Sequence, residues 1–312
     1  MRVGFTPVAS LAMAQLLAGF LWVLPQAGCS RAPVPQGPEY ADTPGSRRES
    51  GFHLAVHPLH NPGKLLASYG PLADHLSARM PGLRFEVEPS RDYGEFERKY
   101  RAQAVAFILP NPWQCLEAMK TGYEVIAMAG EPADFKGIIL VRKDSPVRQV
   151  KDLKGQAVSY PAPTALAACL LPQWFLHTNG LDVNRDIENR YVGSQESSLL
   201  NVYHRQTAAG ATWPAPWRAF CREHPREAGE LKILWETPAM MNNAVMVRSD
   251  VAPAVRDEVL RLLLHLHETP AGQAILAGME TARFLPAGNA DYEPVRRFVA
   301  AFEAGIRPVE KP

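Results

Sequence analysis

Residues 143–158, KDSPVRQVKDLKGQAV, decide the class of fold. Ser145-Pro146 ends an extended piece, because the residue before a proline avoids the helical backbone region. A short helix then carries Asp152-Leu153, and Gly155 ends it, since glycine readily takes the left-handed conformation that closes a helix. A strand is predicted directly after this cap, at Ala157–Tyr160. One stretch of chain thus joins an extended piece, a helix and a strand.

The same alternation extends through the body of the chain. Short apolar and β-branched runs alternate with amphipathic segments from Phe52 onward, which predicts an α/β architecture. Helical spacing of apolar residues predicts helices around residues 65–76 and 255–266. Strands are expected at residues 52–56, 84–88, 104–109, 124–127, 137–141, 157–160, 190–192, 208–212, 231–235 and 244–247.

The first residues have the layout of an export signal. Met1-Arg2 provides a positive start, residues 11–24 form an apolar run, and no acidic residue precedes Glu39. This order is typical of a signal peptide, and the run is shorter than the ~20 apolar residues that a membrane-spanning helix needs. Residues 1–28 are therefore interpreted as a signal peptide.

Small residues directly before Cys29 resemble a bacterial lipobox, although Gln26 stands where a leucine is usual. Cys29 is the predicted site of lipidation, and the alternative is ordinary secretion with Cys29 as a spare thiol. Residues 29–51 are rich in Pro, Gly, Arg and Ser, which is typical of a flexible tether. We therefore expect the protein to lie in the periplasm, anchored to the membrane through a lipid on this cysteine.

Composition and motifs narrow the functional classes. Hydrophobic residues make up 46% and charged residues 21%, as in a soluble globular body, and the net charge of +1 gives no sign of nucleic-acid binding. Cys115, Cys169 and Cys221 show no spacing typical of a structural metal site. No GxSxG, HExxH or glycine-rich phosphate loop occurs in the sequence. We therefore expect no metal, no cofactor and no enzymatic activity.

Several motifs in order resemble the phosphate/phosphite/phosphonate-binding family of type II periplasmic binding proteins. These are the stretch 143–158, HPLHNP at 57–62 with the following helix, AFILPNP at 106–112, and VGSQE at 192–196. The resemblance covers about residues 52–300. It implies two α/β lobes, with a hinge crossed twice and a cleft between the lobes. Lobe one is expected at 52–136 and 240–312, and lobe two at 137–239.

The resemblance places an oxyanion at the start of a helix in lobe two, near Tyr160, Thr164 and Ala165. Unpaired backbone N–H groups and the helix dipole favour an anion at such a position. Members of the family have hydroxyl-bearing residues at the start of this helix, but this chain has alanine or leucine at residues 165–168. Thr164 is the one hydroxyl that remains, as a helix cap, a ligand contact or both. The missing hydroxyls put phosphonate specificity in doubt.

Other candidate ligand-binding residues follow predicted strands. His57, His60 and Asn61 lie in the first loop, with loop packing as the alternative for the histidines. Asn111 and an exposed Trp113 follow the strand at 104–109, and Glu196, Thr212 and Trp213 follow later strands. Cys115 is a candidate thiol ligand, as arsenite-sensing relatives use a cysteine. Cys169 competes for this role, and a buried structural cysteine is the alternative.

The expected function is capture of a small oxyanion-like ligand of the phosphonate, phosphite or phosphate class. The expected partner is the permease of an ABC transporter. Signalling to a membrane sensor kinase, for example of arsenite bound by a cysteine, is the alternative. We expect the protein to be a monomer that binds no nucleic acid.

Overall fold

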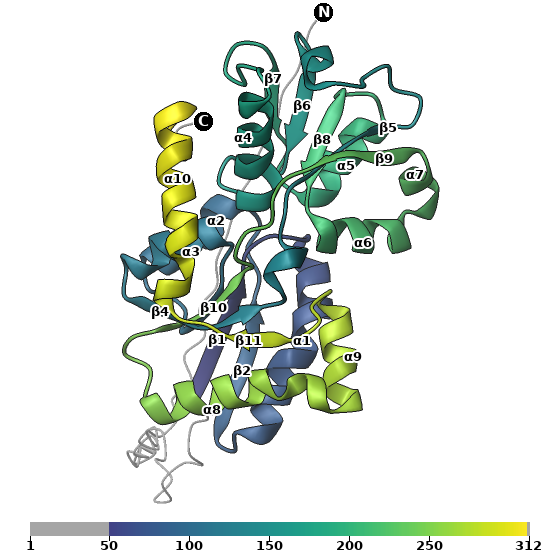
Figure 1. The fold of residues 1–312 in the computed structure, drawn as a ribbon. Coiled ribbons are helices and arrows are strands. Elements are labelled where there is room, and N and C mark those ends of the chain that lie inside the picture. The colour runs from purple at the N-terminus through teal and green to yellow at the C-terminus, as the bar shows by residue number, and fades with distance from the viewer. Residues whose placement is uncertain (1–49, 311–312) are drawn as a thin grey trace, which may run out of the picture. The chain divides into compact units, whose positions relative to one another are not determined.

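A computed structural model describes residues 50–310, and the predicted signal peptide, Cys29 and most of the tether lie outside this range. The described strands form two mixed α/β bodies with separate sheets (Figure 1). The first strand begins at Ser50, two residues inside the predicted tether. Among residues 50–310, no helix combines the length and the apolar character needed to cross a bilayer.

The first sheet has six strands in the order β11-β4-β10-β3-β1-β2. Strand β1 pairs in parallel with β2 and β3, whereas β10 and β11 run antiparallel to their neighbours. Phe52 of β1 lies opposite Phe85 of β2, and their rings stack with centroids 5.4 Å apart. The strands are β1 (Ser50–Val56), β2 (Leu83–Glu88), β3 (Phe107–Leu109), β4 (Tyr123–Ala129), β10 (Ala244–Arg248) and β11 (Phe284–Pro286).

Helices of the first body pack on this sheet or on one another through apolar faces. Leu65, Tyr69, Leu72 and Leu76 recur at helical spacing in α1 and are buried, as the sequence pattern predicts, whereas Leu66 is exposed. Asn61 caps α1 by accepting a hydrogen bond from the backbone N–H of Lys64. The helices are α1 (Pro62–Arg79), α2 (Tyr93–Arg101), α3 (Pro112–Met119), α8 (Pro253–Leu264), α9 (Pro270–Gly278) and the C-terminal α10 (Glu293–Gly305).

The second sheet has five strands in the order β7-β6-β8-β5-β9. Strand β6 pairs in parallel with β7 and β8, and β5 is antiparallel to β8 and β9. The strands are β5 (Ile138–Arg142), β6 (Ala157–Tyr160), β7 (Glu188–Tyr191), β8 (Ala209–Thr212) and β9 (Leu231–Glu236). The helices are α4 (Leu171–Thr178), preceded by a π-helical turn (Leu166–Leu170), α5 (Gln195–Tyr203), α6 (Pro214–Glu223) and α7 (Pro225–Gly229).

The chain passes between the sheets twice, at residues 130–137 and 237–243, and hydrogen bonds join these two crossings. The N–H of Thr237 donates to the carbonyl of Gly137 at 2.9 Å, and the N–H of Gly137 donates to Oγ1 of Thr237 at 2.8 Å. Further along, the N–H of Met240 donates to the carbonyl of Phe135 at 2.8 Å. The two crossings therefore lie side by side as one hydrogen-bonded ribbon.

Gly137 meets a tight packing constraint at the end of the first crossing. A Cβ atom at this position would lie 2.6 Å from the carbonyl oxygen of Ala167 and 2.8 Å from the ring of Pro172. No side chain fits there, so the glycine allows the crossing to lie directly against the π-helical turn.

The architecture is a two-sheet α/β fold, as predicted. Each of the ten predicted strands is present, with bounds that differ by up to three residues. The three-residue strand β11 was not predicted, because so short a run shows no alternation.

Candidate functional site

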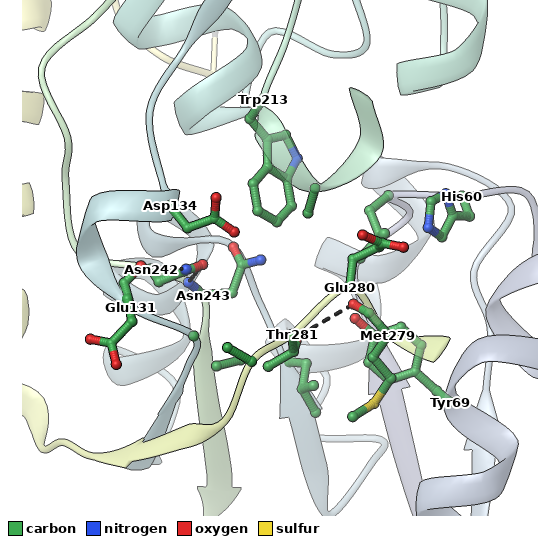
Figure 2. A pocket seen from close by; sticks show the side chains of 16 residues that line it. His60, Tyr69, Glu131, Asp134, Trp213, Asn242, Asn243, Met279, Glu280 and Thr281 are labelled. Atoms are coloured by element: carbon green, nitrogen blue, oxygen red, sulfur yellow. Dashed lines mark hydrogen bonds between the residues drawn. The ribbon is translucent and has the colours of Figure 1, made fainter. Parts of the chain in front are cut away.

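Segments from both sheets enclose a cavity of about 120 Å³. Figure 2 shows Trp213 over this cavity, with Asp134 and the two asparagines on one side and His60, Tyr69 and Glu280 on the other. Most lining residues follow the end of a strand or lie on a crossing. The lining consists of Leu59, His60, Tyr69, Leu109, Ala129, Gly130, Glu131, Asp134, Trp213, Ala215, Asn242, Asn243, Met279, Glu280, Thr281 and Ala282.

Trp213 enters the cavity from the second body. It follows β8 directly and takes the N-cap position of α6, where Pro214 starts the helix with its fixed φ. The indole is 7% exposed and packs on Phe135 of the first crossing, with ring centroids 5.3 Å apart. This packing holds the ring in place beside the cavity.

The two histidines of the first loop have different positions. His57 is buried, its Nδ1 lies 3.0 Å from the carbonyl oxygen of Leu109, and its ring meets Tyr93 and Phe96 edge-on. Burial lowers its pKa to about 4, against the hydrogen bond to Leu109. His60 lines the cavity, and burial, together with the positive charge of Lys64, lowers its pKa to about 3. Both rings are therefore neutral at physiological pH.

Arginines pair with the carboxylates of the lining. Both carboxylate oxygens of Asp134 accept from Arg218 of α6, at 2.8 and 2.7 Å. Glu280 pairs with the same arginine at 3.2 Å and also with Arg222. On the far side, Glu131 accepts two hydrogen bonds from Arg283. The pairs of Arg218 and Arg222, with Lys64 and Glu223 at 2.6 Å, join α6 to segments of the first body and to the first crossing.

The two asparagines of the second crossing differ in their hydrogen bonds. Asn242 donates from Nδ2 to the carbonyl of Glu131, accepts at Oδ1 from the N–H of Asn243, and accepts at its carbonyl from the hydroxyl of Tyr292. Asn243 is 6% exposed, and its buried Oδ1 has no hydrogen-bond partner among the described residues. A buried polar atom without a partner is costly, so this oxygen is an unmet acceptor beside the cavity, covered by neighbouring atoms rather than facing the cavity space.

A second polar cluster lies around the predicted oxyanion position. The hydroxyl of Thr164 donates to Oε1 of Glu97 at 2.8 Å, and Nε2 of Gln114 donates to the same oxygen at 3.1 Å. Nδ2 of Asn111 donates to the carbonyl of Thr164 at 3.2 Å. Burial raises the pKa of Glu97, while the hydrogen bond from Thr164 opposes the shift. A carboxylate of the chain itself therefore occupies the partner position of this hydroxyl.

Gln195 links further residues of this cluster. It accepts from the hydroxyl of Thr212 at 2.8 Å and donates from Nε2 to the hydroxyl of Tyr93 at 3.3 Å. The hydroxyl of Tyr160 is buried and has no partner among the described residues. The part of the chain that the structure describes has no group of three or more His, Cys, Asp or Glu side chains that could hold a metal.

Comparison with known proteins places the chain in a family. The family described as "ABC transporter, phosphonate, periplasmic substrate-binding protein" matches residues 54–292. The chain belongs to this family. It therefore belongs to a family of periplasmic substrate-binding proteins rather than to a family of enzymes.

Individual relatives of this phosphonate-binding family member are distant. The probable ABC transporter phosphite binding protein PhnD1 of Prochlorococcus marinus is 21% identical over 55% of this chain and 62% of its own length. The tetrathionate sensor histidine kinase TtrS of Salmonella typhimurium is 23% identical over 52% of this chain and 29% of its own length. The chain thus spans less than two thirds of either protein.

Solved structures of periplasmic binding proteins are similar in fold, which confirms the predicted type II periplasmic binding protein fold. PhnD1 of Prochlorococcus marinus in complex with methylphosphonate has a TM-score of 0.74 at 17% identity, covering 83% of this chain and 99% of that one. A phosphonate transporter binding protein from Pseudomonas aeruginosa has a TM-score of 0.73 at 16% identity, covering 82% and 87%.

Of the predicted ligand-binding residues, the cavity of this family member gathers only His60 and Trp213. Asn111, Thr164, Thr212 and the backbone at Ala165 belong to the second polar cluster or lie beside it. His57 packs between the two regions. Asn61 is exposed as the cap of α1, and Glu196 lies 3.3 Å from His224 at the surface.

Two expectations about these residues were wrong. Thr164 does not cap the helix, because the π-helical turn begins after Ala165 and the threonine hydroxyl bonds Glu97 instead. Trp113 is 2% exposed rather than exposed, since it lies in the first turn of α3 and packs in the core. Cys115 is fully buried among apolar neighbours, as the alternative of a structural cysteine predicts, and burial raises the pKa of its thiol.

Sequence reasoning missed several residues of the site. Glu97 lies in a basic, polar helix, where it looks like one more solvated charge. The sequence gives one weak indication of its burial, because Glu97 lies at helical spacing with Tyr93 and Tyr100 on the apolar face of α2. Asp134, Glu280 and their partner Arg218 are far apart in sequence, so no local pattern predicts that they meet.

Proposed function

We propose that this chain captures a small solute in the cavity beside Trp213 and presents it to the permease of an ABC importer. Closure of the two bodies over the solute is the proposed signal to the membrane partner. The observation that supports this most is the cavity itself, because its lining comes from both bodies and from both crossings. A solute there would contact every part that has to move together.

The lining of the cavity has few groups that would bind a phosphonate, the ligand class in the family's name. No lysine or arginine belongs to the lining, and Thr164 already bonds the carboxylate of Glu97. A phosphonate, phosphite or phosphate would forgo the charge-assisted hydrogen bonds that normally hold such an anion. We therefore propose solute capture without a dependence on a bare oxyanion.

Thermal unfolding of the purified protein tests capture. A panel of phosphate, phosphite, methylphosphonate, arsenite and small neutral and cationic organic compounds should contain at least one that stabilises the protein. A compound at 100 times its Kd adds about 2.7 kcal/mol. Trp213→Ala should abolish the shift, and Trp217→Ala, one turn further along α6 and outside the lining, should retain it. A shift that survives Trp213→Ala would place the ligand elsewhere.

Sensing is a second candidate, because the chain is similar to part of the sensor kinase TtrS. In this version the closed form would bind a membrane sensor kinase instead of a permease. Deleting the gene separates the two: loss of solute uptake supports import, and loss of a solute-induced transcriptional response with unchanged uptake supports sensing. An arsenite response through Cys115 would require its buried thiol to become accessible.

We further propose that Cys29 carries a lipid that keeps the monomeric protein at the membrane. The proposal is supported by the small residues before this cysteine and by the Pro- and Gly-rich segment after it. Cys29→Ser should move the protein from the membrane fraction to the soluble periplasmic fraction. Unchanged membrane association of this variant would contradict the anchor.

A further inference from the structure

We propose that the cavity beside Trp213 selects a small uncharged polar molecule, whose N–H or O–H group bonds Asn243 and whose apolar part contacts the indole. This inference rests on the proposed function, since it names the class of solute captured at the same cavity.

The first argument is the charge balance of the lining. Three carboxylates belong to it, and each has an arginine partner: Asp134 with Arg218, Glu280 with Arg218 and Arg222, and Glu131 with Arg283. His60 is the basic side chain among the lining residues, and it is neutral because burial lowers its pKa to about 3. The cavity therefore offers no unpaired counter-charge to an anion or to a cation.

The second argument is the unsatisfied amide. Oδ1 of Asn243 is a buried acceptor without a partner among the described residues, whereas the neighbouring Asn242 makes three hydrogen bonds. An acceptor is satisfied by an N–H or O–H donor, and leaving it unmet is unfavourable. Asn243 lines the cavity, but this oxygen is covered by neighbouring atoms, so its side chain would turn toward the cavity to accept from a solute (Figure 2). The new hydrogen bond would then remove the cost of the unmet acceptor.

The third argument is the size and apolar character of the remaining wall. The indole of Trp213 and the side chains of Leu59, Leu109 and Met279 supply apolar surface, and the cavity has about 120 Å³. This is space for a molecule of only a few non-hydrogen atoms. A small pocket with apolar walls and few polar groups suits a ligand with one polar end.

Charge selectivity follows from these three observations. An ion loses its hydration when it enters the cavity, and only an unpaired opposite charge could replace that hydration adequately. Binding an ion would require Arg218 or a carboxylate to leave its present partner. An uncharged molecule enters without breaking these pairs.

Three molecules of nearly the same shape test the inference: acetamide (neutral), acetate (anionic) and acetamidinium (cationic). Each has four non-hydrogen atoms, so binding is expected in the millimolar range or weaker. The indole ¹H–¹⁵N signal of Trp213, assigned by its loss in Trp213→Phe, reports occupancy during titration of the whole protein. We expect acetamide to bind at least tenfold more tightly than either ion.

Variants at the amide complete the test. Asn243→Ala should weaken acetamide binding on the order of tenfold, and Asn184→Ala, at an exposed asparagine outside the cavity, should leave it unchanged. Asn243→Asp should reverse the preference toward acetamidinium, because it adds an unpaired negative charge.

Tighter binding of acetate or acetamidinium to the unmodified protein overturns the inference and leaves solute capture standing. Absence of any shift with all three molecules also overturns it, and the wider thermal panel then decides the proposed function separately.

Discussion

The hydroxyl of Thr164 donates a hydrogen bond to the carboxylate of Glu97, with the two oxygens 2.8 Å apart. The threonine follows β6 of the second sheet, and the glutamate lies on α2 of the first body, 67 residues earlier. Arg101 lies 3.9 Å from the other carboxylate oxygen and balances part of its charge. The contact connects the two bodies at the position where the family resemblance places an oxyanion.

Glu97→Gln should therefore increase the response to anions. The variant keeps the shape of the side chain and removes one buried negative charge close to Thr164, which opposes an incoming anion by about 1–4 kcal/mol at short range. We expect methylphosphonate to stabilise the variant at concentrations at least tenfold lower than those that stabilise the parent protein. Thermal unfolding with increasing methylphosphonate measures this.

Glu95→Gln is a matched control, because Glu95 lies on the same helix and is partly exposed. Equal responses of Glu97→Gln, Glu95→Gln and the parent protein would show that the carboxylate does not govern access to Thr164.

Acidification should destabilise the fold through His57. Its pKa is about 4 in the folded protein and 6.5 in the unfolded chain, so the unfolded chain takes up a proton first as the pH falls. The associated stability is fully present above pH 6.5 and is lost as the pH falls toward 4. At pH 5 the loss from this residue is about 2 kcal/mol, at 1.36 kcal/mol per pH unit.

Urea unfolding between pH 7.5 and pH 5 measures this effect. In His57→Gln, the dependence on pH should be shallower by about that amount. If the free energy of unfolding depends on pH equally in His57→Gln and in the parent protein, burial does not lower the pKa of this histidine.

Removing Arg218 should weaken both closure and solute binding. Arg218→Met deletes the ion pairs to Asp134 and Glu280, and each partly exposed pair contributes about 0.3–1 kcal/mol. The variant also leaves Asp134 without its bidentate partner at the cavity rim. We expect a solute affinity reduced several-fold, with a smaller reduction at high salt, because salt already screens these pairs.

Isothermal titration calorimetry at two ionic strengths measures the change for Arg218→Met. Arg226→Met, at an exposed arginine of α7, controls for the general loss of a surface charge. Similar effects of both variants would mean that Arg218 has no particular role at the rim.

Gly137→Ala should destabilise the protein by about 1–3 kcal/mol, because the new Cβ would lie 2.6 Å from the carbonyl of Ala167. Gly229→Ala is the matched control, since no heavy atom lies within 4 Å of a Cβ there. Chemical denaturation of both variants measures the difference. A neutral Gly137→Ala would show that the crossing can move away from the π-helical turn at little cost.

Much of the fold could be predicted from the sequence, because periodicity is a local property. The apolar spacing in α1 and the run of residues that precedes Gly155 each determine their own secondary structure. The cavity could be predicted only in part. Trp213 follows β8 directly and His60 lies in the short loop after β1, so their positions near strand ends can be inferred from the sequence.

The remaining site residues depend on contacts between distant segments. Glu97 and Thr164 are 67 residues apart and Arg218 and Asp134 are 84 residues apart, so these contacts exist only in the folded structure. The cap at Thr164 was predicted wrongly because a π-helical turn shifts the start of the helix by one residue, and the sequence AAC offers no sign of it. Burial of Trp113 depends on the core that forms around α3.

The hydrogen bonds between Gly137 and Thr237 and between Phe135 and Met240 have a mechanical consequence. Two independent connecting segments could bend and twist separately, and the bodies that they join would then sample many relative orientations. Two segments joined by hydrogen bonds resist twisting more than two separate segments do. The paired crossings thus limit how far the two bodies can twist relative to one another. The C-terminal segment adds a further link between them, because Arg307 donates to Gln173 of α4.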